Sequence, residues 1–242
     1  MISRIFVKRS DAPTKTGDLY DHPYHPDHRP TCIPARPLIR GVAAKSPETS
    51  PAVADIFEER ERLLRSKTEY LDFYGRLKHF PLAVSRATGA LLYMLARSCR
   101  AQTIVEFGTS FGISTLHLAA ALRDNGGGHL ITSEFEPSKV ARARGNLTAG
   151  GLIDLVEIRE GDALQTLSVD LPETIDLLLL DGAKALYCEI LSLLENHLRP
   201  GAFIIADNAD YSPDYLARVR SLPEGYMSVP FADDVELSIR IQ

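Results

Sequence analysis

The chain has 242 residues, enough for one domain of ordinary size together with a terminal extension. Its hydrophobic share of 45% allows a sizeable core, and its formal net charge of −5 leaves no basic excess to bind a phosphate backbone. These values argue against a protein dedicated to binding nucleic acid.

Cysteine usage and the first residues indicate where the protein works. Three cysteines are too few and too scattered for a disulfide framework, and they suit a reducing compartment. The first residues, MISRIFVKRSD, lack the long apolar region of a secretory signal. No aliphatic run is long enough to span a bilayer as a helix. We therefore expect a cytoplasmic protein with no membrane partner.

Residues 1–52 differ in amino-acid composition from the rest of the chain. The stretch DHPYHPDHRPTCIPARP is dense in proline, which prevents a continuous helix. Its histidines and Cys32 match no zinc-binding spacing. We expect an irregular arm over 1–52, followed by a single domain over 53–242.

From residue 53 the apolar pattern becomes regular. Apolar residues recur at helical spacing in VADIFEERERLLRS and in SRATGALLYMLARSC, which predicts two amphipathic helices. Strands and helices then alternate. The predicted strands cover 102–108, 129–135, 155–160, 175–181 and 202–207. The predicted helices cover 113–124, a segment that begins at Pro137, and 184–198. The sequence Arg199-Pro200-Gly201 is expected to end the last of these helices.

The last part of the chain predicts two more strands. YMSVPF and VELSIRIQ are expected to form an antiparallel hairpin at the edge of the sheet. The alternation before them indicates a mostly parallel sheet with helices on both faces.

Acidic residues stand at or just after the end of every predicted parallel strand. They are Glu106, Glu134, Asp162, Asp181 and Asp207, the last followed by Asn208. Because ligands bind at the carboxyl ends of the strands in such sheets, we expect these side chains to meet there. Burying several carboxylates together is costly unless a positive group joins them. A sulfonium, an amine or a divalent metal ion would each meet this requirement.

The turn after the first parallel strand is glycine-rich but does not match GxGxxG. Gly108 permits a close ligand approach, and Gly112 lets the following helix pack tightly. Glu134 is placed to accept hydrogen bonds from a ribose diol, which dinucleotide and adenosyl cofactors share. Asp162 has two open interpretations, since it either faces an adenine amine or caps the helix beginning at ALQTL.

Five motifs together carry a family resemblance. VEFGTSFGIST, ITSEFEP, EGDA, LLLLDGAK and IIADNAD, in this order, resemble the class I S-adenosylmethionine-dependent O-methyltransferases, most of all the catechol and caffeoyl-CoA type. The resemblance covers the chain from about Leu82 to its end. It implies a Rossmann-like class I methyltransferase fold, with a mostly parallel seven-stranded sheet, an antiparallel C-terminal hairpin and helices on both faces. The family often associates in pairs, so the resemblance also implies a homodimer.

The resemblance assigns roles to individual residues. The cofactor that it implies is S-adenosylmethionine. Gly108, Ser110 and Ser114 would lie along its methionine portion, with Glu106 supporting the loop, and Glu134 would bind the ribose. Phe135, Gly161, Asp162 and Ala163 would surround the adenine, Asp181 would lie between the cofactor and the metal, and Ser85 falls where the family closes over the cofactor. Asp181, Asp207 and Asn208 match the family's divalent metal ligands, an all-oxygen set of the kind Mg²⁺ prefers. Lys184 matches the general base, whose pKa we expect the nearby metal charge and partial desolvation to depress.

Two departures from the family pattern concern the methyl acceptor. The chain after Asn208 is short, and Gly182-Ala183 are small where the family helps to hold a flat catechol with an aromatic bracket. Both favour a different small hydroxylated acceptor, bound with help from the N-terminal arm.

Other interpretations stay open at this point. Without the family, Asp207-Asn208 are also turn formers, and Lys184 is also a solvated lysine in a first helical turn. Three other functions compete with a metal-assisted O-methyltransferase: a metal-independent N- or O-methyltransferase, a non-catalytic methyltransferase-like binding module, and a nicotinamide dehydrogenase. The glycine spacing argues against the last of these.

Overall fold

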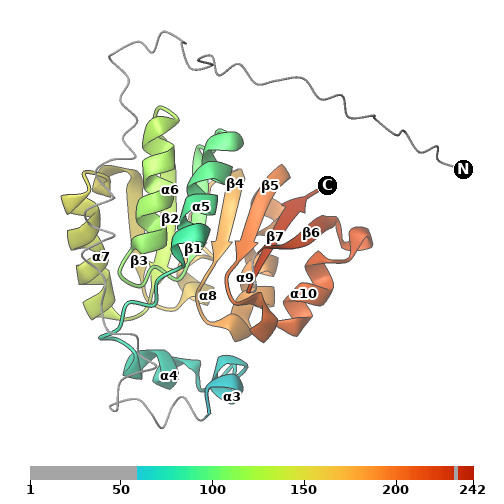
Figure 1. Cartoon of the computed structure of the whole chain (residues 1–242), viewed down its shortest axis with the longest axis horizontal. Coiled ribbons are helices and arrows are strands. Elements are labelled where there is room, and N and C mark those ends of the chain that lie inside the picture. The colour runs from blue at the N-terminus through green and yellow to red at the C-terminus, as the bar shows by residue number, and fades with distance from the viewer. Residues whose placement is uncertain (1–58, 232–233) are drawn as a thin grey trace, which may run out of the picture.

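The computed structural model describes residues 59–231 and 234–242. The arm expected over 1–52, and the beginning of the first expected helix, lie outside the described residues. Figure 1 shows a central sheet with helices on both faces and a small pair of helices at one end.

In the described part of the chain, seven strands form one sheet in the order β3-β2-β1-β4-β5-β7-β6. Their bounds are β1 Thr103–Phe107, β2 His129–Glu134, β3 Val156–Glu160, β4 Ile175–Leu180, β5 Leu198–Ala206, β6 Tyr226–Phe231 and β7 Val235–Arg240. Strands β1 to β5 pair in parallel, whereas β7 is antiparallel to both β5 and β6. The predicted Rossmann-like sheet with its antiparallel C-terminal hairpin is confirmed.

The helices divide between the two faces of the sheet. Their bounds are α3 Arg60–Leu64, α4 Tyr70–Arg76, α5 Arg86–Ser98, α6 Ile113–Asp124, α7 Pro137–Ala149, α8 Ala163–Thr166, α9 Tyr187–Leu194 and α10 Pro213–Val219. Helices α5, α6 and α7 pack on one face, and α8, α9 and α10 pack on the other. No described helix has both the length and the apolar character of a membrane span.

Local sequence signals explain where the predicted helices begin. The Ser85 hydroxyl accepts a hydrogen bond from the Thr88 amide at 3.0 Å and so caps α5. Pro137 occupies the first turn of α7, where its missing N–H costs nothing. Helix α6 follows Gly112, whose φ of 79° suits a residue without a side chain.

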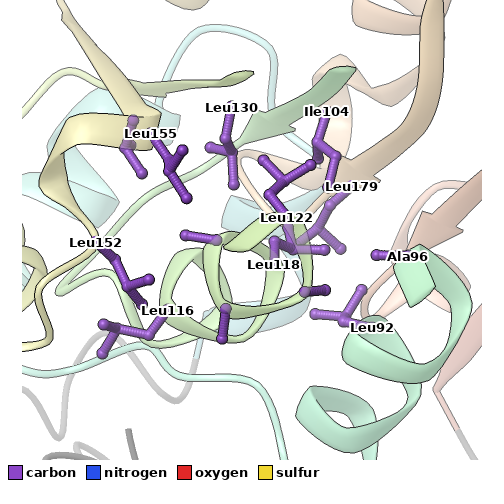
Figure 2. Close-up of a cluster of buried hydrophobic side chains, with 14 of the residues drawn as sticks. Leu92, Ala96, Ile104, Leu116, Leu118, Leu122, Leu130, Leu152, Leu155 and Leu179 are labelled. Carbon is purple, nitrogen blue, oxygen red and sulfur yellow. The ribbon is translucent and has the colours of Figure 1, made fainter. Parts of the chain in front are cut away.

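The core on the α6 face is built from aliphatic side chains of the sheet and of three helices. Figure 2 shows Leu118 and Leu122 of α6 between the strand residues Ile104 and Leu130 on one side and α5 on the other, and Leu116 of α6 beside Leu152. These α6 leucines are fully buried. Each buried leucine contributes about 2 kcal/mol through removal of apolar surface from water. This packing fixes α6, and with it the loop between β1 and α6.

Three features differ from the sequence predictions. Helix α9 ends at Leu194, and β5 already begins at Leu198, so Pro200-Gly201 lie inside the strand rather than ending the helix. The strand tolerates the proline because the β4–β5 pairing is irregular at that end. Helices α4 and α10 were not predicted, because α4 is short and α10 lies in the stretch taken as a connection to the hairpin.

Candidate functional site

A cavity of about 620 Å³ lies at the carboxyl ends of β1 to β4. Figure 1 shows α3 and α4 beyond this end of the sheet, and side chains of α4 form one wall of the cavity. The predicted site residues that line it are Gly108, Ser110, Glu134, Phe135, Gly161, Asp162, Ala163 and Asp181. Part of this volume is open to solvent, and its lining combines apolar and aromatic side chains with a few polar groups, as in sites for small ligands.

Three predicted cofactor residues do not line the cavity. Ser114 and Glu106 lie behind the loop after β1, where the Ser114 hydroxyl donates to Glu106 at 2.5 Å. Thr115 and Thr132 also donate to the Glu106 carboxylate, at 2.5 and 2.6 Å. Ser85 is exposed and caps α5. Burial raises the pKa of Glu106 to about 7, although its three hydroxyl donors lower it.

The glycine after β1 brings two loops into contact. Gly108 has a φ of 103°, and a Cβ atom there would lie 2.6 Å from the Gly182 nitrogen. A Cβ on Gly182 would in turn lie 2.5 Å from the Phe107 ring. Small residues are therefore needed on both loops, which leaves open space in the cavity above them.

Glu134 is held rigidly at the end of β2. Its Oε2 accepts from the Ser110 amide at 2.8 Å, and its Oε1 accepts from the Glu136 amide at 3.0 Å. Each carboxylate oxygen retains a lone pair for a further donor, so a vicinal diol fits this group. Asp162 caps α8 through the Leu164 amide at 2.9 Å and also borders the cavity, so its two open interpretations are compatible.

A cluster of charged and phenolic groups adjoins the cavity at the ends of β4 and β5. Lys184 Nζ donates to Asp181 Oδ1 at 2.9 Å, and the Lys184 side chain is only 5% exposed. Asp207 lies beside Asp181. The Tyr187 hydroxyl, beneath Lys184, donates to the Asp207 carbonyl at 2.7 Å. The solvated interpretation of Lys184 is wrong.

The charged groups of this cluster shift one another's pKa. Burial lowers the pKa of Lys184, but Asp181 and the other neighbours outweigh burial and hold that pKa well above its usual range. The depressed lysine pKa expected beside a metal ion stays a prediction, because it concerns the site with the ion bound. Burial raises the pKa of Asp181 and also that of Asp207, which reaches about 7 because the Asp181 charge adds to it.

The residues predicted to hold a divalent cation fit that role by their chemistry. Two buried carboxylates share Lys184 as their near cation, so further positive charge is favourable. The Asn208 amide group donates through Nδ2 to Asp234 at 3.0 Å, and this orientation leaves its carbonyl oxygen as an available ligand atom. Within residues 59–231 and 234–242, however, no group of three or more His, Cys, Asp or Glu side chains is arranged to hold a metal ion. Other ligands would have to come from water or substrate.

Several cavity residues escaped the sequence analysis. They are Tyr70, Leu71, Tyr74 and Leu82 from α4 and the segment after it, Ser133 in β2, Lys139 in the first turn of α7, and Leu186 after Lys184. The spacing of Tyr70, Phe73 and Tyr74 is helical and was a usable signal for α4. No local signal distinguishes Lys139 from a solvated helical lysine.

Comparison with known proteins agrees with this geometry. Residues 105–209 match the family model described as a methyltransferase domain. Catechol O-methyltransferase of Niastella koreensis is 38% identical over 130 residues, covering 52% of this chain and 58% of that protein. Catechol O-methyltransferase B of Danio rerio is 31% identical over 174 residues, covering 69% of this chain and 65% of that protein. The chain therefore spans less than two thirds of the length of these curated relatives.

A solved structure extends the similarity. The O-methyltransferase TomG from Streptomyces achromogenes, involved in tomaymycin synthesis and solved in complex with SAM, is 25% identical to this chain. The superposition covers 80% of this chain and 100% of that one, with a TM-score of 0.60.

Proposed function

We propose that the protein is an S-adenosylmethionine-dependent O-methyltransferase acting on a small hydroxylated molecule, in keeping with the match of residues 105–209 to a methyltransferase-domain family model. The observation that carries the proposal is the continuity of the cavity with the Lys184 cluster. Glu134 and Asp162 stand at one end of the cavity, and Asp181, beside Lys184 and Asp207, stands at the other.

The first half of the proposal concerns the cofactor and the residues that bind its parts. S-adenosylmethionine, when bound, supplies an electrophilic methyl carbon on its sulfonium. Glu134 accepts the ribose hydroxyls, and Phe135, Gly161 and Ala163 enclose the adenine beside Asp162. Ser110 and Gly108 follow the methionine portion. Glu106 and Ser114 act indirectly, because their hydrogen bond supports the loop from behind.

The acceptor half of the proposal involves a divalent cation, Mg²⁺ or a similar ion. Asp181, Asp207 and the Asn208 carbonyl would hold it. When bound, such an ion supplies positive charge that lowers the pKa of an acceptor hydroxyl. Lys184 would take up the hydroxyl proton at Nζ. For that role the ammonium must first lose its own proton, which requires Asp181 to be engaged by another positive charge.

The test is a calorimetric titration of the protein with S-adenosylhomocysteine, first with Mg²⁺ and then with a chelator. We expect binding in both conditions, because Glu134 and the adenine-enclosing residues are positioned independently of Asp207. Dihydroxy aromatic compounds are then screened as acceptors with and without metal. Binding without turnover of any acceptor would favour the non-catalytic module, and turnover unaffected by chelator would favour the metal-independent enzyme. Absence of binding in both conditions contradicts the proposal.

The proposal includes a homodimer. Edge strand β6 exposes Met227 and Val229, whose side chains are 57% and 53% accessible, on the sheet face away from α10. Exposed apolar side chains on a sheet edge are suited to a second copy of the chain. Light scattering measures the mass directly, and replacement of both side chains by lysine is expected to give monomers.

A further inference from the structure

We infer that Lys139 is a positioning residue of the cofactor cavity, which keeps the Glu134 carboxylate ionised so that it can accept two ribose hydroxyls. This inference rests on the proposed function and adds to it a residue that no sequence motif marks.

The position of Lys139 is unfavourable for a lysine unless it has a partner. The residue is 3% exposed and lies in the first turn of α7, where the helix dipole disfavours a cation. Burial of an ammonium group is itself costly. Among the described residues no ion pair or hydrogen bond satisfies this ammonium directly, and the side chain borders the cavity. The Lys139 ammonium therefore opens onto the cavity, and the acidic groups that favour its charge act at longer range.

The main charge facing Lys139 belongs to Glu134. Burial raises the pKa of Glu134, and Lys139 is the strongest of the influences that lower it again, ahead of the backbone donors. Reciprocally, burial lowers the pKa of Lys139, and Glu134 is the strongest of the influences that raise it. The two groups thus maintain each other's charge, although they make no direct contact.

The surrounding charges make this lysine hard to replace. Lys139 is the one cationic side chain that lines the cavity within the described residues. The titratable groups that face the Glu134–Lys139 pair are Glu106 on β1, Glu136 at the start of α7, Asp162 after β3, Asp181 after β4 and Tyr70 on α4. None of these can supply positive charge. Without Lys139, the end of the cavity at β2 would hold only acids.

Ionisation of Glu134 matters because of its hydrogen bonds. The Ser110 and Glu136 amides already occupy one lone pair on each oxygen. A carboxylate has a further lone pair on each oxygen for the two hydroxyls of a ribose. A protonated carboxyl group turns one oxygen into a donor, which removes one of these bonds and opposes an amide. Loss of Lys139 should therefore weaken cofactor binding most strongly at low pH.

The experiment is a calorimetric titration of S-adenosylhomocysteine into the full-length wild type and the Lys139→Met variant across a pH series. Taking the ratio of the two dissociation constants at each pH cancels ionisation of the ligand and of Glu106. We expect a ratio within about threefold at the alkaline end, rising by up to about tenfold per pH unit as the pH falls below the Glu134 pKa of the variant, and levelling off below the Glu134 pKa of the wild type. Lys139→Arg should restore a flat ratio, because it restores the charge.

Two controls separate this role from a purely structural one. Lys78→Met removes an exposed lysine whose charge also faces Glu136, and it should leave the ratio flat. In a Glu134→Gln background, Lys139→Met should add no pH-dependent loss, since no carboxylate remains to protonate. Thermal unfolding checks that each variant is folded, and Lys139→Gln replaces Lys139→Met if the latter is not.

The outcomes are distinct. A ratio that is raised equally at every pH overturns the inference and makes Lys139 a direct ligand contact or a packing residue. A ratio of one throughout overturns it as well, while the proposed function stands. Failure of the wild type to bind S-adenosylhomocysteine at any pH contradicts the proposed function, and the inference with it.

Discussion

Glu106 and Glu134, at the ends of β1 and β2, contrast with Asp181 and Asp207, which follow β4 and β5. All four carboxyl groups are largely buried at the same edge of the sheet. The first pair receives hydrogen bonds from three hydroxyl groups and two backbone amides. The second pair depends mainly on the ammonium of one residue, Lys184.

This difference separates a preformed half of the cavity from an incomplete one. Neutral donors fixed by the fold, together with Lys139 beside Glu134, partly compensate the carboxylates of β1 and β2 before any ligand arrives, although burial still raises the pKa of Glu106 to about 7. Asp181 and Asp207 repel each other across the end of β4, and a single lysine only partly relieves the repulsion. A region that is electrostatically incomplete without added charge is where we expect chemistry to depend on an external cation.

Lys184→Met removes the cation beside Asp181 and Asp207, and so tests the incomplete half of the cavity most directly. We expect turnover of an acceptor found by screening to fall by about 10²- to 10⁴-fold, the usual contribution of a proton-transfer group. The affinity for S-adenosylhomocysteine should stay within about threefold, because Lys184 is not among the side chains that line the cavity. Single-turnover methyl transfer measures the first quantity and calorimetry the second. Lys67→Met, which removes an exposed lysine paired with Glu189, is the control; full activity of Lys184→Met would exclude the lysine from the mechanism.

Glu134→Ala tests the preformed half. We expect S-adenosylhomocysteine binding to weaken by about 1–3 kcal/mol, since ribose hydroxyls lose their acceptor and two backbone amides lose theirs. Calorimetric titration measures this loss, and turnover at saturating cofactor should change little. Glu160→Ala is a matched control, because Glu160 ends the neighbouring strand β3 but is exposed. Unchanged affinity of Glu134→Ala would show that the ribose lies elsewhere.

The sequence predicted most of the frame of this cavity. Apolar runs such as Leu177–Leu180 and helix-start residues such as Pro137 and Gly112 are local signals. Strands and helices could therefore be placed within a few residues. That strand ends meet at one edge follows from the parallel topology alone. Glu134 and Asp181 were therefore predictable as neighbours of one cavity.

What the sequence could not predict depends on tertiary distances. The sequence PSKVARAR is polar enough to suggest a solvated helix. The burial of Lys139 becomes visible only in the tertiary structure, where α7 packs against β2. The 2.9 Å distance between Lys184 Nζ and Asp181 Oδ1, which holds the lysine pKa well above its usual range, is likewise a product of the tertiary fold. Ser85 caps α5 through a local hydrogen bond, but its position outside the cavity lining depends on the tertiary fold and was not predictable.

Asp207→Asn sharpens the comparison by removing the repulsion without changing the shape of the side chain. We expect the metal-free protein to become more stable by about 1–2 kcal/mol, because one buried charge is removed and Asp181 keeps Lys184. Chemical denaturation in the presence of chelator measures this change. Methyl transfer should at the same time lose its response to Mg²⁺. Asp210→Asn, an exposed residue in the same turn, serves as the control; lower stability of Asp207→Asn would mean that its charge is well compensated in the fold.

Glu106→Gln measures how fully neutral donors compensate a buried carboxylate in the preformed half. The folded pKa of Glu106, about 7, lies above its ordinary value of 4.5. Between these two values the folded state binds more protons than the unfolded state, so this group makes stability fall as pH rises. The Gln variant cannot titrate, and its stability should therefore decline less steeply, by about 1 kcal/mol per pH unit, between about pH 5 and pH 7. Urea denaturation across that range gives both slopes, and Asp207 contributes equally to each. Parallel slopes would show that Ser114, Thr115 and Thr132 stabilise the ionised form as well as water does, and the two halves of the cavity would then differ even more than their geometry indicates.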